Sequence, residues 1–231
     1  MPGLDDSYTK ALLHMDGADG SITFTDESGK SWGAGGTAQI DTAQYKFGGA
    51  SGLFDGNSDY LETADNDDFY FTGAWTIDFW VRFASLSGYQ TILSQYVDTN
   101  NQLQIRKDDV SNSLLFYIKT GGTVRAQINT SSAAFSATDT WYHVALVWDG
   151  ATFYIFINGT SVSLTTITAY GVPGDIAATV IIAGYVPVAY YLNGWLDEFR
   201  WSKGIARWTA NFTPPTREYG GGGQVIIWSS E

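Results

Sequence analysis

The 231-residue sequence contains no cysteine, and proline, histidine and methionine are rare, at 5, 2 and 2 residues. Without cysteine there are no disulfide bonds and no thiolate metal sites, so the fold must rely on its core or on bound ions. Basic residues are also scarce: 12 Lys and Arg stand against 24 Asp and Glu, which gives a net charge of -12. Nucleic acids and anionic membrane surfaces attract clustered positive charge, so the sequence predicts neither as a partner.

Long hydrophobic runs are missing as well. No apolar stretch reaches the roughly 18 residues of a membrane span. The opening residues, MPGLDDSYTK, lack the basic segment and apolar run of a secretory signal peptide. We find no internal repeat and no long helical periodicity. The sequence therefore predicts a soluble protein that is made in the cytoplasm and has no signal peptide.

Aromatic residues are plentiful instead, with 9 Trp, 14 Tyr and 13 Phe, and many occur in short alternating segments. In residues 75–83, WTIDFWVRF, every second side chain is apolar, which predicts a strand with one face in the core. Other short strands are expected at 11–15, 21–24, 37–40, 44–47, 52–54, 60–61, 90–96, 102–106, 114–118, 123–128, 161–166, 179–184 and 193–201. Many short strands between turns predict an all-β protein, either a two-sheet sandwich or a barrel.

The clearest single unit is a predicted β-hairpin at 141–159, WYHVALVWDGATFYIFING. Asp149-Gly150 predicts a two-residue turn, because Gly tolerates the positive φ of a type I′ turn, and Asn158-Gly159 predicts a second tight turn. An isolated hairpin is marginally stable, so this one must belong to a larger sheet. Residues 204–209, GIARWT, are expected to form one helical turn.

The sequence favours one domain. We expect residues 1–10 to form a lead-in or arm and residues 11–215 to form the domain, which ends at Pro214-Pro215 because paired prolines cannot join a central strand. Residues 216–231 are expected to hold a Gly-rich linker and a C-terminal tail. The apolar strip 224–228 within the tail either returns to the sheet as an edge strand or docks on a neighbouring copy.

Catalytic patterns are hard to find. His14 and His143 both lie in apolar strand patterns, which favours hydrogen-bonded core histidines. Glycoside hydrolysis needs two facing carboxylates, but Asp197 and Glu198 are adjacent and therefore predicted to point to opposite faces of a strand. We expect no catalytic residue, and an enzyme would have to assemble its site from loops.

Two acidic turns, 16–20 and 26–30, lie close together in the sequence. Calcium takes about six to eight oxygen ligands, so the two turns could wrap such a cation. Asp and Gly are also good turn formers, and the residues alone leave both interpretations open. Aromatic side chains in loops could stack on the apolar C–H faces of sugar rings. The candidates for carbohydrate binding are Trp32, Tyr96, Tyr170, Tyr185, Tyr190 and Tyr191.

Four motifs together resemble a known family. They are LFDGNSDYLE at 53–62, WTIDFWVRF, WYHVALVWDGATFYIFING and GWLDEFRWSKGIARWTANFTPP at 194–215. In this order they look like the laminin-G-like or concanavalin A-like jelly-roll module, over about residues 12–215. The resemblance implies two antiparallel sheets in a sandwich without catalytic duty by default. The ending DEFRWSKGIARWTANFTPP is similar to versions found in bacteriophage virion proteins.

The resemblance also implies a structural Ca²⁺. Family members often hold this ion between the early acidic loop and the Asp of the late D-E-F-R strand, which suggests Asp26 with Asp197, and then Asp16 and Asp19. The paired catalytic acids of the family's β-glucan hydrolases are missing from this sequence.

The function expected from the sequence is that of a non-enzymatic phage surface protein, either a capsid decoration or a tail-associated protein. It would sit on the virion surface, with other virion subunits and further copies of itself as partners, and with host or environmental glycans as ligands. Two alternatives remain at this stage: a soluble calcium-dependent carbohydrate-binding module, and a glycan hydrolase with an unfamiliar site.

Overall fold

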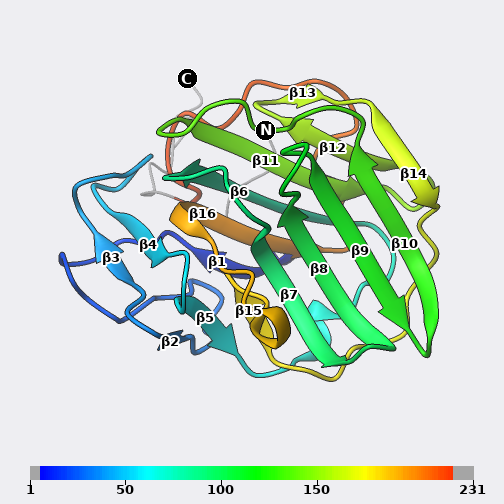
Figure 1. Ribbon diagram of the computed structural model, residues 1–231, viewed down its shortest axis with the longest axis horizontal. Coiled ribbons are helices and arrows are strands. Elements are labelled where there is room, and N and C mark those ends of the chain that lie inside the picture. The colour runs from blue at the N-terminus through cyan, green and yellow to red at the C-terminus, as the bar shows by residue number, and fades with distance from the viewer. Residues whose placement is uncertain (1–5, 221–231) are drawn as a thin grey trace, which may run out of the picture.

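The computed structural model describes residues 6–220, which form two antiparallel β-sheets of eight strands packed face to face (Figure 1). The predicted all-β sandwich of the jelly-roll type is therefore confirmed. Helix within the described residues amounts to two 3-10 turns, η1 (Asp67–Phe69) and η2 (Val186–Val188). No helix of residues 6–220 is long and apolar enough to cross a membrane.

The first sheet, called here the β6 sheet, has β6 and β16 at its centre. Its order is β13 (Thr160–Ser161), β12 (Phe153–Ile157), β11 (Trp141–Trp148), β6 (Trp75–Phe83), β16 (Asn193–Lys203), β4 (Ser51–Asp55) and β3 (Gln39–Asp41), with β1 (Thr9–Leu13) paired to β16. Strand β16 is thus flanked by β6 along one edge and by β1 and β4 along the other.

The second sheet, called here the β8 sheet, has β8 and β7 at its centre. Its order is β14 (Leu164–Thr168), β10 (Thr123–Thr130), β9 (Leu114–Thr120), β8 (Asn101–Lys107), β7 (Gln90–Asp98), β15 (Val180–Ile182), β5 (Tyr60–Thr63) and β2 (Gly33–Gly35). Strands β7 to β10 follow one another in the chain, so local hairpins build most of this sheet.

The core lies between the two sheets and is filled by alternate strand residues. Strand β6 has the predicted bounds, and its alternate residues from Trp75 to Phe83 belong to the core, whereas Trp80 packs on Phe47 and His143 on the outer face. Trp75 is fully buried and stacks on Phe116 of the opposite sheet, with 5.5 Å between ring centroids. Burying one such aromatic side chain contributes about 2 kcal/mol, so these cross-sheet contacts hold the layers together.

Residues 21–24 do not form the predicted strand, because Phe24 makes only an isolated β-bridge to Trp32. Two further local predictions are wrong. Residues 44–47 form a loop and no strand, because the backbone N–H groups of Lys46 and Phe47 donate to the side chain of Asp197. Residues 204–209 are irregular and not helical: the Thr76 hydroxyl accepts from the Arg207 N–H. In both places a side chain that is distant in the sequence accepts hydrogen bonds from backbone N–H groups, and these bonds replace local backbone pairing.

The two predicted hairpin turns differ. Trp148 pairs with Phe153, so the Asp149-Gly150 turn is longer than the two residues predicted. The Asp149 carboxylate accepts from the N–H groups of residues 151 and 152 and stabilises this wider loop. The Asn158-Gly159 turn has two residues, as predicted, with φ of 51° and 76° in the left-handed region.

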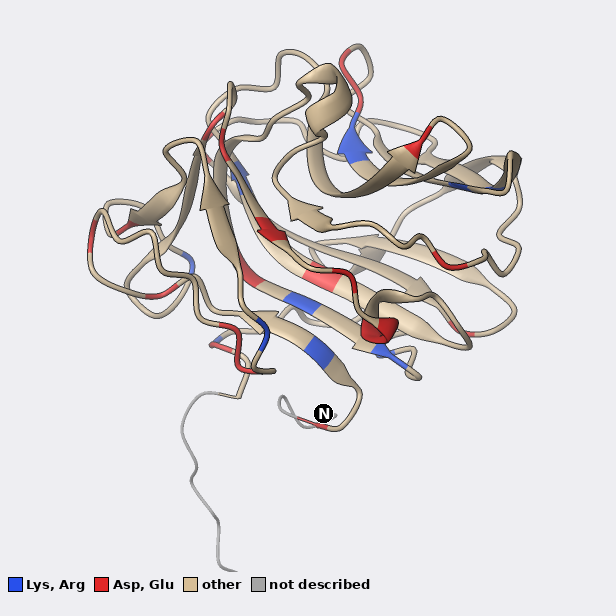
Figure 2. Cartoon of the chain, turned by 90° about the horizontal axis from the view of Figure 1, so that it is seen from below, with Lys and Arg blue, Asp and Glu red and all other residues tan. Residues whose placement is uncertain are grey.

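The outer face of the β6 sheet is covered by the chain's own C-terminal part, residues 204–220. Trp208 and Phe212 pack on Phe156 of β12, and Tyr219 is fully buried. Figure 2 shows acidic and basic residues on neighbouring strands in the middle of the molecule. A ligand site is therefore expected on the outer face of the β8 sheet.

Candidate functional site

Three polar side chains of β8 form a hydrogen-bonded row on the outer face of the β8 sheet. Gln102, Gln104 and Arg106 alternate with Leu103 and Ile105, which belong to the core. Gln104 Nε2 donates to Gln102 Oε1 at 2.9 Å, and Arg106 NH1 donates to Gln104 Oε1 at 2.8 Å. The amide and guanidinium groups therefore form a hydrogen-bonded line along β8, at the centre of this sheet.

Two tyrosines lie at one end of the row. Tyr185, directly before η2, donates its hydroxyl hydrogen to Gln102 Oε1 at 2.8 Å. Its ring meets that of Tyr96 on β7 edge-on, with 5.6 Å between centroids. Burial raises the pKa of Tyr185 to about 12, so the hydroxyl remains a proton donor across the physiological pH range.

Two further tyrosines hold the guanidinium at the other end. The Arg106 carbon Cζ lies 4.7 Å from the ring centroid of Tyr89 and 5.7 Å from that of Tyr190. The two rings themselves are 4.9 Å apart. Such cation–π contacts fix the plane of the guanidinium. We call this surface the tyrosine face; its residues are Tyr89, Tyr96, Tyr185, Tyr190, Gln102, Gln104 and Arg106.

A cleft of about 390 Å³ adjoins the tyrosine face. Tyr89, Tyr190, Tyr191, Asp109 and Asn193 contribute to its walls, together with serines and glycines of the loops around them. Asp109 Oδ1 accepts from the N–H of Gly88, which holds one wall in place. The cleft thus combines aromatic rings with hydrogen-bonding groups, as small-ligand sites do.

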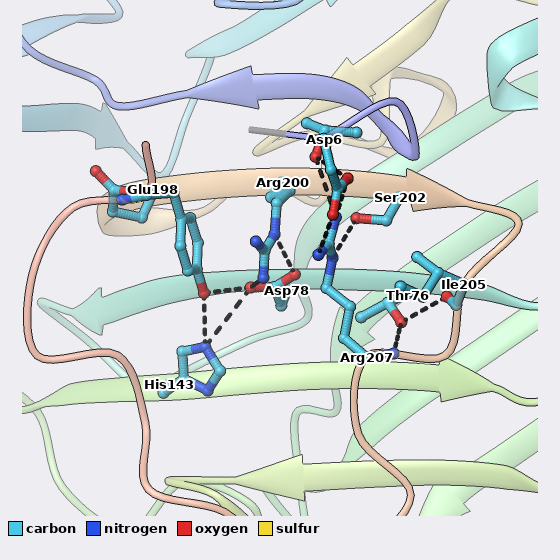
Figure 3. Close-up of polar contacts among 11 residues, drawn as sticks. Asp6, Thr76, Asp78, His143, Glu198, Arg200, Ser202, Ile205 and Arg207 are labelled. Atoms are coloured by element: carbon cyan, nitrogen blue, oxygen red, sulfur yellow. Dashed lines mark hydrogen bonds and ion pairs between the residues drawn. The ribbon is translucent and has the colours of Figure 1, made fainter. Parts of the chain in front are cut away.

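A second polar cluster lies on the outer face of the β6 sheet (Figure 3). Asp78 accepts two hydrogen bonds of 3.0 Å from Arg200, and His143 Nε2 lies 3.7 Å from the same carboxylate. Tyr219 donates its hydroxyl hydrogen to Asp78 and its N–H to Glu198 Oε2, the latter at 2.7 Å. All five residues are at most 1% exposed. This cluster fastens residue 219 to the sheet and offers no open surface to a ligand.

A family model described as the concanavalin A-like lectin/glucanases superfamily matches residues 55–207, more than half of the chain. The chain belongs to this superfamily. The resemblance noted in the sequence motifs is thereby confirmed. No curated protein sequence matches the chain significantly.

Solved structures are similar over most of the chain. Domain 4 of AbnA, a GH43 extracellular arabinanase from Geobacillus stearothermophilus solved with arabinotriose, is similar with a TM-score of 0.62 and 17% identity, covering 87% of this chain and 95% of that domain. The binding domain of Paraclostridial Mosquitocidal Protein 1 is similar with a TM-score of 0.61 and 17% identity, covering 85% of this chain and 49% of the other.

Botulinum neurotoxin type C, whose cell entry depends on two ganglioside molecules, is similar with a TM-score of 0.59 and 16% identity. The alignment covers 86% of this chain and 48% of that one. The superfamily domain therefore spans about half the length of these toxin chains. At such identities the likeness describes the fold.

The structure brings four of the six predicted aromatic residues of this superfamily domain to one place. Tyr96, Tyr185 and Tyr190 belong to the tyrosine face, and Tyr191 lines the adjoining cleft. Tyr96 lies in strand β7 and not in a loop as expected. Trp32 is buried, and its Nε1–H donates to Asp26, so its ring is not exposed to a sugar. Tyr170 is half-buried: it packs on the core, and its hydroxyl accepts from Trp75 Nε1.

The predicted metal ligands do not gather into one cluster. Within residues 6–220, no group of three or more His, Cys, Asp and Glu side chains is arranged to hold a metal ion. Both oxygens of Asp26 are occupied: Oδ1 accepts from the N–H groups of Leu12 and Ser28, and Oδ2 from Trp32. Asp19 is exposed and accepts from the N–H of Thr42. Asp26 and Asp19 thus act as structural acceptors.

Asp16 and Asp197 do approach the same loop. Asp197 Oδ2 accepts from the N–H groups of Lys46 and Phe47, and Asp16 lies so close to Gly48 that a Cβ there would be 2.1 Å from its Oδ1. The Oδ1 atoms of both carboxylates are buried and lack a partner among the described residues. Burial raises the pKa of Asp197 to about 8, with Glu198 and Asp16 adding to the rise. Two orphaned carboxylate oxygens are the kind of donor that Ca²⁺ prefers.

The expectation that Asp197 and Glu198 point to opposite faces is wrong. The pairing of β16 with β6 shifts between Asp197 and Arg200, and Glu198 has φ of 53°. This bulge inserts one residue, so that both carboxylates lie between the core residues Leu196 and Phe199, on the outer side. Glu198 binds His14 Nδ1 at 2.7 Å as a result.

Sequence reasoning missed Tyr89, Gln102, Gln104 and Arg106. Tyr89 precedes β7 in a Ser-Gly loop and had no pattern to mark it. The three residues of β8 did carry a signal, because Gln-x-Gln-x-Arg at period two predicts one polar strand face. What the sequence could not show is that the tyrosines of two distant loops lie beside that face.

Proposed function

We propose that this domain is a non-catalytic carbohydrate-binding module and that the tyrosine face with its adjoining cleft holds the glycan. The observation that carries the proposal is the convergence of four tyrosines on a fixed row of Gln102, Gln104 and Arg106. Sugars present apolar C–H faces and hydroxyl groups together. Tyrosine rings complement the former, and amide, phenol and guanidinium groups complement the latter.

Rigidity supports a binding role. The polar groups stand on a central strand, and each tyrosine is held by a ring contact or a hydrogen bond before any ligand arrives. A site prepared in this way loses little conformational entropy when it binds. The likeness to an arabinanase domain solved with arabinotriose, and to a toxin whose cell entry depends on gangliosides, agrees with a glycan as ligand.

The non-catalytic part of the proposal rests on the strands beneath the tyrosine face. Strands β7 to β10 carry one acidic residue, Asp98, and its Oδ1 accepts from Asn100 and Asn101 at the turn after β7. The usual glycoside hydrolysis needs two carboxyl groups within roughly 5 to 10 Å of each other across the sugar. Asp109 is a carboxylate of the cleft, and it is held by Gly88. We therefore expect saturable binding without release of reducing sugar.

Binding to a broad glycan array, followed by calorimetric titration of the best hit, tests the proposal. Tyr190→Ala should weaken binding at least tenfold, because it removes a stacking ring and one support of Arg106. Tyr45→Ala is the matched control, since Tyr45 is 51% exposed and lies outside the tyrosine face. Equal effects of both substitutions, or a blank array, would refute the proposal.

We also propose that Asp16 and Asp197 hold a structural Ca²⁺ in this domain. Their buried, unpartnered Oδ1 atoms support it, and backbone carbonyls of the loop around Gly48 would have to complete the oxygen shell. When bound, such an ion would supply positive charge that offsets the two carboxylates. Its role would be to fix residues 46–48 against β16.

The setting of a phage particle remains part of the proposal. It is supported by the resemblance of residues 197–215 to virion proteins, and it implies other virion subunits and further copies of the chain as partners. The predicted tail at 224–228 lies outside the described residues. Mass spectrometry of purified particles tests this setting, and absence of the protein from them would contradict it.

A further inference from the structure

Positive charge is concentrated beneath the tyrosine face, although the whole chain is acidic. Strands β7 to β10 contain Arg106, Lys107, Lys119 and Arg125, four of the chain's 12 basic residues, and one acidic residue, Asp98. Lys107 points inward and is bound by carbonyl groups and Asn112. Lys119 alternates with the core residue Ile118 and therefore shares the outer face with Arg106.

Arg106 makes few polar interactions with the other described residues of the chain. None of the ion pairs within residues 6–220 includes it, and its one hydrogen bond runs from NH1 to Gln104. A guanidinium has five N–H donors, and the Nε of Arg106 is buried without an acceptor. An unmatched buried donor destabilises the free domain, and the NH2 group, which makes no hydrogen bond within residues 6–220, is left for a ligand.

The two carboxylates that follow β8 in the sequence, Asp108 and Asp109, are hydrogen-bonded to loop N–H groups. Asp108 accepts through Oδ2 from the N–H groups of Val110 and Ser111 and from the Ser111 hydroxyl. Asp109 accepts from the N–H of Gly88. Both residues lie in the turn after β8. The guanidinium of Arg106 packs instead against the rings of Tyr89 and Tyr190. Arg106 attracts Asp108 electrostatically, but its guanidinium contacts two rings and Gln104 and makes no ion pair with an anion of the described residues.

We infer that the glycan bound at the tyrosine face is acidic, and that Arg106 recognises a carboxylate of one of its sugar units. The planar fork of a guanidinium matches a carboxylate, and its contact with two rings leaves it preorganised. Tyrosine rings would hold the sugar beside it, and Lys119 would add attraction along the same face. This inference rests on the proposed function, because it specifies the ligand of the same site.

Matched polysaccharide pairs test the inference. Polygalacturonate, alginate, hyaluronan and sialyl-oligosaccharides are each compared with their carboxyl-reduced forms, in which each carboxylate becomes a neutral hydroxymethyl group. The full chain should bind at least one acidic member and bind its reduced form at least tenfold more weakly, with affinity that falls as salt is raised. Arg106→Gln should lower the affinity for the acidic polysaccharide to the affinity for its carboxyl-reduced form.

Arg217→Gln is the control, since it removes the same charge from an exposed position beyond the tyrosine face. Its binding should match that of the unchanged chain. Equal binding of acidic and reduced partners, still lost in Tyr190→Ala, would overturn the inference and leave the proposed function standing. Binding to no glycan, or binding that neither Tyr190→Ala nor Arg106→Gln changes, would overturn both. Circular dichroism of each variant excludes loss of folding.

Discussion

Arg200 binds Asp78 through two parallel hydrogen bonds, Nε to Oδ1 and NH2 to Oδ2, each 3.0 Å long, and neither side chain is more than 1% exposed. Removing one partner of such a pair leaves a buried, uncompensated charge. Arg200→Met should therefore lower the free energy of unfolding by about 3–5 kcal/mol, measured by urea denaturation. The double variant Arg200→Met with Asp78→Leu should recover part of this loss. A double variant less stable than the single one would contradict the expectation.

The same pair predicts a dependence on acid. Burial acts to raise the pKa of Asp78, but Arg200 and His143 outweigh it and lower the pKa from 3.8 to about 2. The folded state therefore binds this proton less readily than the unfolded chain, and ionised Asp78 stabilises the fold above about pH 4. This contribution, about 2 kcal/mol, should be lost as the pH falls from about 4 to about 2. Thermal denaturation measured between these two pH values checks the loss. Asp78→Asn should remove most of the dependence of stability on pH in this range.

Tyr219 should matter more than its place near the chain end suggests. Its hydroxyl donates to Asp78 and lies 3.2 Å from His143 Nε2. Tyr219→Phe leaves these buried groups without that partner, so stability should fall by about 1–3 kcal/mol. Tyr45→Phe, at an exposed position, should leave the denaturation midpoint unchanged. Equal midpoints for the two variants would show that the hydroxyl contributes nothing.

Two glycines with positive φ should respond differently to alanine. At Gly159 an added Cβ would lie 1.9 Å from the carbonyl oxygen of Phe212, whereas at Gly150 nothing lies within 4 Å. Gly150→Ala carries only backbone strain, about 1 kcal/mol. Gly159→Ala adds a clash with the segment that covers the β6 sheet, so it should cost clearly more. Melting temperatures of the two variants decide this, and equal values would refute the contact.

Chelation should test the proposed calcium site. A chelator should lower the melting temperature of the unchanged chain, since an ion that binds only the folded state stabilises it. Asp197→Asn should abolish this sensitivity. Asp19→Asn should keep it, because Asp19 is exposed and accepts only from Thr42. A melting temperature that does not respond to chelator would mean that the acidic loops are turns and nothing more.

The sequence by itself determined the sandwich and much of its core. Alternation within WTIDFWVRF placed Trp75, Ile77 and Phe79 in the core, and the hairpin strands β11 and β12 were located from their apolar pattern. These features follow from the alternation of side chains within a strand. This alternation depends only on residues that are neighbours in the sequence.

Only the tertiary structure decided where the binding groups meet. Tyr89, Arg106 and Tyr190 come from segments up to a hundred residues apart, and they converge because β15 joins β7 at the centre of the β8 sheet. The bulge at Glu198 likewise depends on pairing with β6, so strand alternation alone placed the two carboxylates on the wrong faces. Strand order and bulges depend on contacts between distant segments, and the local pattern of a sequence does not contain them.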